Sequence, residues 1–335
     1  MTCKWFAFIG LAALACAQDD PVFKVNSDLV LVDAQVVSKK TGRTIADLKR
    51  GDFEIYEDGV KQDIAFFSQN TLPLSIVFLF DLTESVQPVL KPLGAGALEA
   101  LQHLKPEDET AVMVYAATAQ MIQDFTTDRK LTVDAIRQAS EMKSEDEAFF
   151  NEGIFQAADA LSRSKNPSSR RVIIWLTDNV PNIPSGSAAD NVAKKGLTLH
   201  TEADAFRRLF ETGTVVSSLL ERSAMSNTFL VLYSKNPLFA GVRKHHPPGD
   251  VFKYADETGG QVMKSSKSEV AEKLADLIDQ IRSRYSLGYR PPASKAPGAF
   301  YEIKLKVVPE IAKREGQVVV KAKRGYYREA AAKTQ

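Results

Sequence analysis

The sequence predicts an α/β fold: a doubly wound, mostly parallel sheet inserted in, or flanked by, a small β-sandwich built from both chain ends. Two apolar runs, 75–80 and 171–178, fit strands buried on both faces. Strands alternate with helical patterns across 71–284, as in doubly wound sheets. Apolar and polar residues alternate instead in 22–70 and 285–328, which is typical of strands with one solvated face.

The N-terminal segment, 22–70, is expected to form a small β unit. Residues 23–37 alternate loosely and predict one or two strands. Asp58-Gly59 stands between two alternating runs, and this pair predicts a tight hairpin, because a primed turn needs positive φ at both central residues.

The α/β domain, 71–284, contains a regular series of predicted elements. After the first buried strand we expect, in order, a helix over 86–104, a hairpin of strands 109–117 and 121–125, helices over 128–142 and 151–164, the strand at 171–178, a helix over 201–212, a strand over 215–220 with a possible partner at 229–233, a helix from 252, an edge strand at 261–263 and a helix over 268–284.

The C-terminal segment, 285–328, returns to β texture, with strands expected at 285–289, 301–307 and 317–323. The simplest assembly joins it to 22–70 in one sandwich. The alternative is that each end packs on the α/β domain alone.

The overall charge is nearly balanced. The 335 residues contain 43 Lys+Arg and 42 Asp+Glu, and 44% are hydrophobic. Such a chain can build large cores, and nothing in its charge indicates a nucleic-acid or membrane-surface binder.

Residues 1–17 have the features of a secretory signal peptide. Lys4 precedes a short apolar run, and Ala15-Cys16-Ala17 fits a cleavage site. We therefore expect an exported protein of the periplasm, envelope or extracellular space, without a transmembrane span after cleavage. Cys16 leaves a second interpretation open, a lipid anchor. Cys3 and Cys16 are the only cysteines, so cleavage would leave no thiol, which favours a bacterial exported protein.

Oxygen-bearing side chains follow both buried strands. Asp81, Thr83 and Ser85 occupy alternate positions after the first strand, and Asp178 ends the second. Carboxylates and hydroxyls at the carboxyl ends of central strands are hard-cation ligands at the usual site position of open α/β sheets. Mg²⁺, or else Mn²⁺ or Ca²⁺, is the expected ion.

This pattern resembles the von Willebrand factor type A domain, whose metal-ion-dependent adhesion site begins with Asp-x-Ser-x-Ser. The resemblance implies that Asp81, Thr83, Ser85 and Asp178 hold the metal, and that a carboxylate of a protein partner completes its coordination. The flanking segments 52–59 and 285–289 look like an exported bacterial family related to this domain and abundant in Acidobacteria, which implies fold and export.

The loop before the third helix departs from the family pattern, because 147–153 lacks the usual Thr. Asn151 or Glu152 could supply a substitute oxygen. Phe149 and Phe150 could form an exposed partner-contact pair, or fold inwards. Asn179 replaces the usual Gly after Asp178, and Asn tolerates positive φ.

No hydrolase elbow, phosphate-binding loop or zinc-protease motif occurs, and His245-His246 fits a solvated loop, so we do not expect an enzyme. The sequence therefore favours an exported binding module that recognises a protein through a metal site. The alternative is a metal-independent scaffold protein of the cell envelope, in which the site is degenerate.

Overall fold

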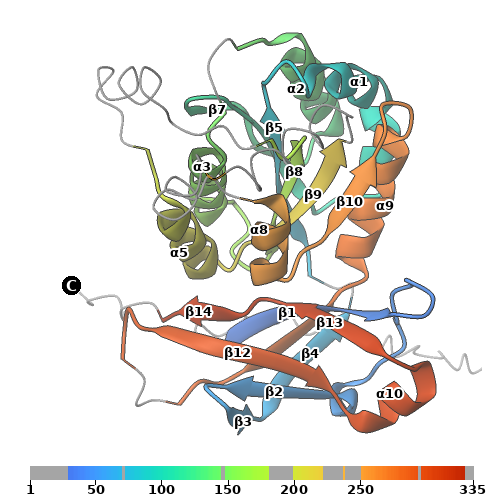
Figure 1. The fold of residues 1–335 in the computed structure, drawn as a ribbon, viewed down its shortest axis with the longest axis vertical. Coiled ribbons are helices and arrows are strands. Elements are labelled where there is room, and N and C mark those ends of the chain that lie inside the picture. The colour runs from blue at the N-terminus through green and yellow to red at the C-terminus, as the bar shows by residue number, and fades with distance from the viewer. Residues whose placement is uncertain are drawn as a thin grey trace, which may run out of the picture.

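The computed structural model describes residues 29–69, 72–144, 148–180, 199–221, 237, 250–292 and 296–328. Six strands form the sheet of the domain that lies uppermost in Figure 1. Their order is β10-β9-β8-β5-β6-β7, and only the β6–β7 hairpin is antiparallel. The strands are β5 (Leu74–Asp81), β6 (Glu109–Tyr115), β7 (Ala119–Thr126), β8 (Arg170–Thr177), β9 (Val215–Glu221) and β10 (Val262–Ser265).

Helices cover both faces of this sheet (Figure 1). Successive side chains of β5 point to opposite faces, so Phe78 packs with one set of helices and Leu79 with the other. The first set is α1 (Gln87–Leu101), α2 (Arg129–Glu141) and α9 (Val270–Arg282), and the second is α3 (Phe150–Ser162), α5 (Glu202–Thr212) and α8 (Val251–Thr258). The predicted doubly wound α/β fold is confirmed.

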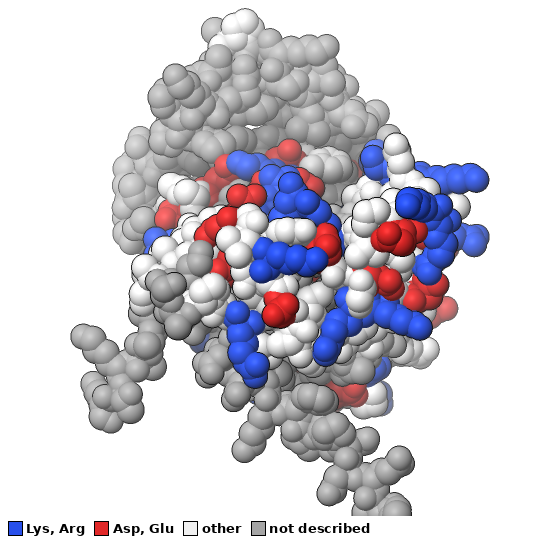
Figure 2. Space-filling view, turned by 90° about the horizontal axis from the view of Figure 1, so that it is seen from below, with Lys and Arg blue, Asp and Glu red and all other residues white. Residues whose placement is uncertain are grey.

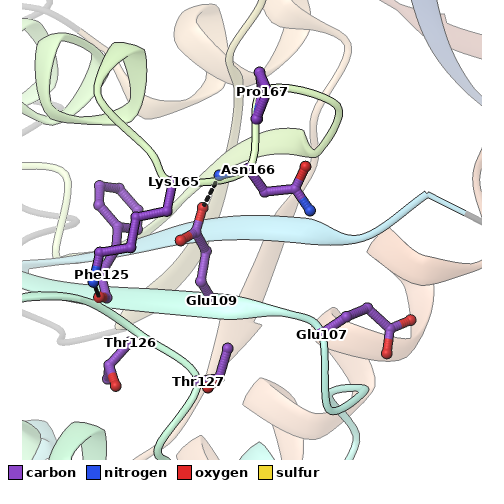
Figure 3. A pocket seen from close by; sticks show the side chains of 8 residues that line it. All are labelled: Glu107, Glu109, Phe125, Thr126, Thr127, Lys165, Asn166 and Pro167. Carbon is purple, nitrogen blue, oxygen red and sulfur yellow. Dashed lines mark hydrogen bonds between the residues drawn. The ribbon is translucent and has the colours of Figure 1, made fainter. Parts of the chain in front are cut away.

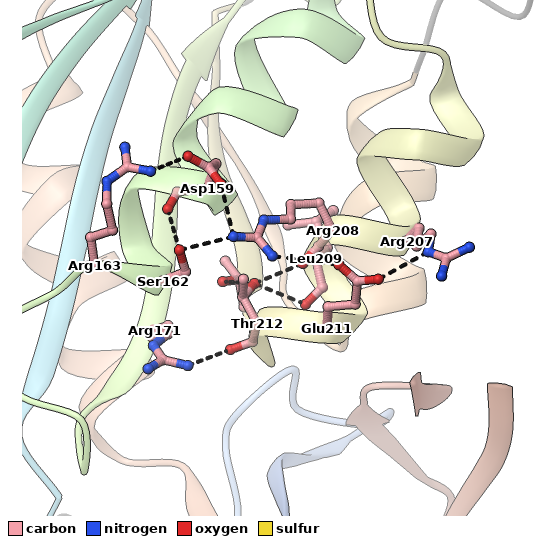
Figure 4. Close-up of polar contacts among 10 residues, drawn as sticks. Asp159, Ser162, Arg163, Arg171, Arg207, Arg208, Leu209, Glu211 and Thr212 are labelled. Carbon is pink, nitrogen blue, oxygen red and sulfur yellow. Dashed lines mark hydrogen bonds and ion pairs between the residues drawn. The ribbon is translucent and has the colours of Figure 1, made fainter. Parts of the chain in front are cut away.

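Polar contacts join α3 to α5 beside the sheet (Figure 4). The Arg208 guanidinium donates to Asp159 Oδ1 at 2.8 Å and to Ser162 Oγ at 2.9 Å. Arg163 pairs with the other oxygen of Asp159. These bonds satisfy partly buried charges and fix the end of α3 relative to α5.

The two ends of the chain form the lower unit together (Figure 1), as the joint-sandwich prediction required. One sheet has the order β13-β1-β11-β4 and the other β14-β12-β2-β3. The elements are β1 (Val30–Ser38), η1 (Arg50–Asp52), β2 (Phe53–Glu57), β3 (Val60–Gln62), β4 (Ile64–Gln69), β11 (Tyr285–Tyr289), β12 (Phe300–Val307), α10 (Pro309–Glu315), β13 (Val318–Ala322) and β14 (Gly325–Tyr327). The turn between β2 and β3 has φ of 47° at Asp58 and 81° at Gly59, as expected.

Figure 2 shows the sandwich end of the molecule, where basic and acidic side chains lie interspersed. On this unit the Lys61 ammonium pairs with Glu54 at 2.6 Å, and Lys306 lies 4.8 Å from the centre of the Tyr56 ring. The lysines of these alternating strands therefore share a solvated face with acids and an aromatic ring.

The two units meet at the end of α8. Arg284, which is 2% exposed, donates to the Gly259 carbonyl at 2.5 Å, and burial lowers the pKa of this guanidinium to about 10. The Arg324 N–H, on the sandwich side, donates to the Glu257 carbonyl at 3.0 Å. Gly259 ends α8 with φ of 77° and lies against the Ala322 backbone. This contact needs a residue without a side chain.

The signal-peptide segment with Cys16, the possible strand at 229–233 and the His245-His246 pair lie outside the described residues. In the part of the chain that the structure describes, no helix has both the length and the apolar character needed to cross a membrane.

We predict that Gly259→Ala destabilises the protein far more than Gly298→Ala. Both glycines have φ of 77°, but an added Cβ at Gly259 would lie 2.3 Å from the Ala322 carbonyl carbon, whereas Gly298 has open space. The left-handed conformation alone costs about 1–2 kcal/mol, and the overlap should raise the loss for Gly259→Ala to about 3 kcal/mol or more. Urea denaturation measures both. Equal losses would contradict the described junction.

Candidate metal-ion site

Two buried carboxylates lie at the carboxyl edge of the sheet. Asp81 is the last residue of β5, and Asp178 directly follows β8, its parallel neighbour. They are 1% and 3% exposed. The carboxyl ends of adjacent parallel strands meet at one edge, so the fold brings both acids to the same side of the sheet.

The loop after β5 gathers the other two predicted oxygens around Asp81. Asp81 Oδ1 accepts hydrogen bonds from the Thr83 N–H at 2.9 Å and from the Thr83 hydroxyl at 2.7 Å. Thr83 Oγ1 lies 3.3 Å from Ser85 Oγ. The alternate spacing of Asp81, Thr83 and Ser85 thus places three side-chain oxygens in one turn before α1, with Ser85 exposed to solvent.

The other oxygen of Asp81 faces the protein interior. Asp81 Oδ2 accepts from the Tyr115 hydroxyl at 3.0 Å and from the Thr177 hydroxyl at 3.4 Å. Tyr115 in turn accepts from the Trp175 indole N–H at 2.9 Å. An added Cβ at Gly153 would lie 2.8 Å from the Tyr115 ring, so glycine makes room for this tyrosine. Sequence reasoning missed Tyr115, although it ends the strand next to Asp81.

Charge is poorly compensated at this edge. The pKa of Asp81 is raised to about 6, chiefly by burial and also by the negative charge of Asp178, while hydrogen bonds from Thr83 and Tyr115 act in the opposite direction. Within the described residues, neither carboxylate forms an ion pair with Lys, Arg or His. A cation at this edge would relieve the repulsion between the two acids.

A third acid, Glu221, ends β9 on the far side of β8 and was missed by sequence reasoning. It is 6% exposed, and its Oε2 has no hydrogen-bond partner among the residues that the structure describes. Burial and the charge of Asp178 raise the pKa of Glu221. A carboxylate at the end of a buried strand was the available signal, as it was for Asp81 and Asp178.

Asn179 connects the edge to α8. Its φ is 56°. We expected Asn to tolerate a positive φ where the family usually has Gly, and this value agrees with that expectation. Its Oδ1 accepts from the Val251 N–H at 2.9 Å, and its Nδ2 donates to Asp250 Oδ1 at 3.3 Å. Asn179 therefore helps to cap the helix whose other end contacts the sandwich.

The substitute ligands proposed for the loop before α3 have other partners. Asn151 Oδ1 accepts from the Tyr254 hydroxyl at 2.7 Å. Glu152 Oε2 contacts the His200 N–H at 3.0 Å and the ring Nδ1 at 2.7 Å, and its Oε1 accepts from Gln156 at 2.8 Å. These contacts join Asn151 to α8 and Glu152 to His200, which precedes α5.

The prediction of an exposed partner-contact pair is wrong. Phe149 and Phe150 are 4% and 1% exposed. The Phe150 ring lies edge-on to Trp175, with centroids 4.9 Å apart, and also contacts Tyr115. Burial of an aromatic ring against two others is more favourable than leaving it in solvent, so the loop folds inwards, the alternative considered above.

The donor set formed by Asp81, Thr83, Ser85 and Asp178 fits a small hard cation. Ligand oxygens around Mg²⁺ lie about 2.1 Å from the ion and so roughly 3 Å from one another, close to the spacings of 2.7 and 3.3 Å within the loop. In the described chain no three His, Cys, Asp or Glu residues converge on one point. The ion would therefore depend on two carboxylates, two hydroxyls and water.

We predict a pH-dependent stability difference between the wild type and Asp81→Asn in metal-free buffer. The pKa of Asp81 rises from 3.8 to about 6, so the folded protein binds this proton more tightly than the unfolded chain. The resulting stabilisation is complete below pH 3.8 and is lost as pH rises through about 6. Asn carries no charge at either pH.

Between pH 4.5 and 7.5, the free energy of unfolding should therefore shift in favour of Asp81→Asn by about 2 kcal/mol. Urea denaturation at the two pH values measures this shift. Asp134→Asn, at a position whose side chain is 69% exposed, is the control and should show almost none. A flat difference for Asp81→Asn would contradict the described burial.

Residues 76–180 match the profile of the von Willebrand factor type A domain. No curated protein matches the sequence. Similar solved structures include a von Willebrand factor type A protein from Catenulispora acidiphila (11% identity, 86% of this chain and 76% of that chain, TM-score 0.44). Another is the corresponding domain of the type V pili tip protein Mfa5 from Porphyromonas gingivalis (10%, 63% and 95%, TM-score 0.42).

The PilB minor pilin from Streptococcus sanguinis is also similar (10% identity, 63% of this chain, TM-score 0.43), and the match spans only 62% of the PilB chain. The profile match covers β5, the loop carrying Thr83 and Ser85, and β8 with Asp178. Residues 76–180 of the α/β domain are therefore similar to a von Willebrand factor type A domain.

Proposed function

We propose that the protein is a binding module of adhesion type, which recognises a protein partner through a divalent cation held by Asp81, Thr83, Ser85 and Asp178. The observation that carries the proposal is the convergence of Asp81, Thr83 and Ser85 oxygens at 2.7 and 3.3 Å beside a second buried carboxylate. Among the described residues, no cationic side chain forms an ion pair with either carboxylate. Mg²⁺ is the first candidate, and Mn²⁺ or Ca²⁺ could replace it.

Each residue has a distinct role in this proposal. Asp81 and Asp178 supply negative charge from rigid strand ends, and their burial makes neutralisation by a cation favourable. Thr83 and Ser85 supply neutral oxygens from the more exposed loop. A bound ion would offer an open coordination position to a carboxylate of the partner. Tyr115 and Thr177 would hold Asp81 in place from below.

We further propose that the protein works outside the cytoplasm, in the periplasm, envelope or extracellular space. The basic start, apolar run and Ala-x-Ala site of residues 1–17 support this proposal. A location outside the cytoplasm would give the module access to surface proteins as partners. It acts in this view by binding rather than by catalysis.

A metal-independent scaffold is the second candidate, and one observation favours it. Both oxygens of Asp81 already accept hydrogen bonds, from Thr83, Tyr115 and Thr177. A carboxylate satisfied in this way can remain buried without an ion. Binding of an envelope partner that persists in EDTA would support this alternative.

Calorimetric titration of the purified protein with Mg²⁺ and Mn²⁺ tests the proposal. We expect a binding heat for the wild type and none for Asp81→Ala, since the substitution removes a charged ligand. Glu152→Gln is the matched control and should bind like the wild type, because Glu152 contacts His200 instead. Pull-down from an envelope fraction should retain a partner with Mg²⁺ and lose it with EDTA. No heat with the folded wild type would refute the metal site.

A further inference from the structure

A cavity of about 430 Å³ lies at the amino-terminal end of β6, away from the proposed metal site (Figure 3). Its walls come from the start of β6, the end of β7 and the turn between α3 and β8. Because β5 and β6 run parallel, this end of the sheet lies roughly 20 Å from the edge that bears Asp81. The metal-site proposal does not involve it.

Glu109 is the central feature of this cavity. The residue is 4% exposed, and its Oε1 accepts from the Ser75 hydroxyl at 2.6 Å and from the Asn166 N–H at 3.2 Å. Figure 3 shows this carboxylate facing the segment that carries Lys165 and Asn166. In the described chain, Oε2 accepts no hydrogen bond and pairs with no cation, so one oxygen of a buried carboxylate is left for a ligand.

The cationic side chains on adjoining elements contact groups other than Glu109. Lys165 Nζ donates to the Phe125 carbonyl at 2.7 Å. Arg282 pairs with Asp108, and Arg129 donates to the Asp108 carbonyl at 2.9 Å. None of these three forms an ion pair with Glu109 within the described residues, although all lie on adjoining elements.

The remaining walls suit a short aliphatic cation. Glu107, Thr126 and Thr127 also line the cavity. Phe125 and Pro167 give apolar surface for methylene groups. Two acids against one lysine leave the cavity with a net negative charge.

We propose that this cavity binds an alkylammonium group, either of a free small amine or of a lysine side chain on a partner protein. The ammonium donates to Glu109 Oε2, and its aliphatic stem lies along Phe125. A bond between a charged donor and a desolvated carboxylate is stronger than one between neutral groups, which gives the cavity its preference for cations.

Amide NMR titration of the full chain with cadaverine tests the proposal, with acetate as the anionic probe. Cadaverine should shift the amide resonances of Thr127 and Asn166, and acetate should not. Nα-acetyl-lysine methylamide, titrated in parallel, separates the two sources. Binding of cadaverine assigns a free amine, and binding of the lysine derivative alone assigns a protein side chain.

Two substitutions give opposite expectations. Glu109→Gln keeps an oxygen for the Asn166 N–H but removes the charge, and it should weaken amine binding roughly tenfold or more. Lys165→Met removes a like charge on an exposed residue and should tighten binding about twofold to fivefold. Asp81→Asn, at the opposite edge, is the control and should leave amine binding unchanged.

The Lys165→Met variant still tests amine binding in the cavity if Glu109→Gln does not fold. Absence of amide shifts at saturating concentrations of both cadaverine and the lysine derivative would overturn the proposal, as would weaker amine binding by Lys165→Met. Both readouts are made in EDTA, so failure of the metal-site proposal would not affect them.

Discussion

Burial of the Asp81 carboxylate at the end of the central strand is the constraint that arranges the side chains at the carboxyl edge of the sheet. Its oxygens accept from Thr83 in the following loop, Tyr115 in β6 and Thr177 in β8. Tyr115 needs the space left by Gly153 and lies beside Phe150. The inward fold of the loop before α3 therefore belongs to the same arrangement that positions the candidate metal ligand.

Helix α8 links the carboxyl edge of the sheet to the sandwich. Asn179, next to Asp178, caps the start of that helix, while Gly259 and Glu257 at its end contact the β-strands built from the two chain ends. The sheet order β13-β1-β11-β4 makes the sandwich impossible to form without both ends. The α/β domain is thus held at both of its connections and also along α8.

Local sequence patterns were enough to predict the elements that are marked by an apolar run or by a turn dipeptide. The apolar runs predicted β5 and β8, and Asp58-Gly59 predicted the hairpin, because each depends on neighbouring residues only. The seven-residue helix α10 was missed, since so short a segment has too few apolar positions to show a period. Alternation also indicated the convergence of Asp81, Thr83 and Ser85. The bond from Tyr115 depends on the register of β5 with β6, and the burial of Phe150 depends on Trp175 in β8, so neither could be read from local sequence.

We propose that Asp81, Thr83, Ser85 and Asp178 form one cation site at the carboxyl edge of the sheet. Anomalous diffraction from crystals grown in Mn²⁺ tests it most directly, because the signal locates the ion without assuming its ligands. We expect a peak at the carboxyl edge of the sheet, bordered by Thr83 and Ser85 on one side and Asp178 on the other. A map from saturated crystals with no peak at that position would contradict it.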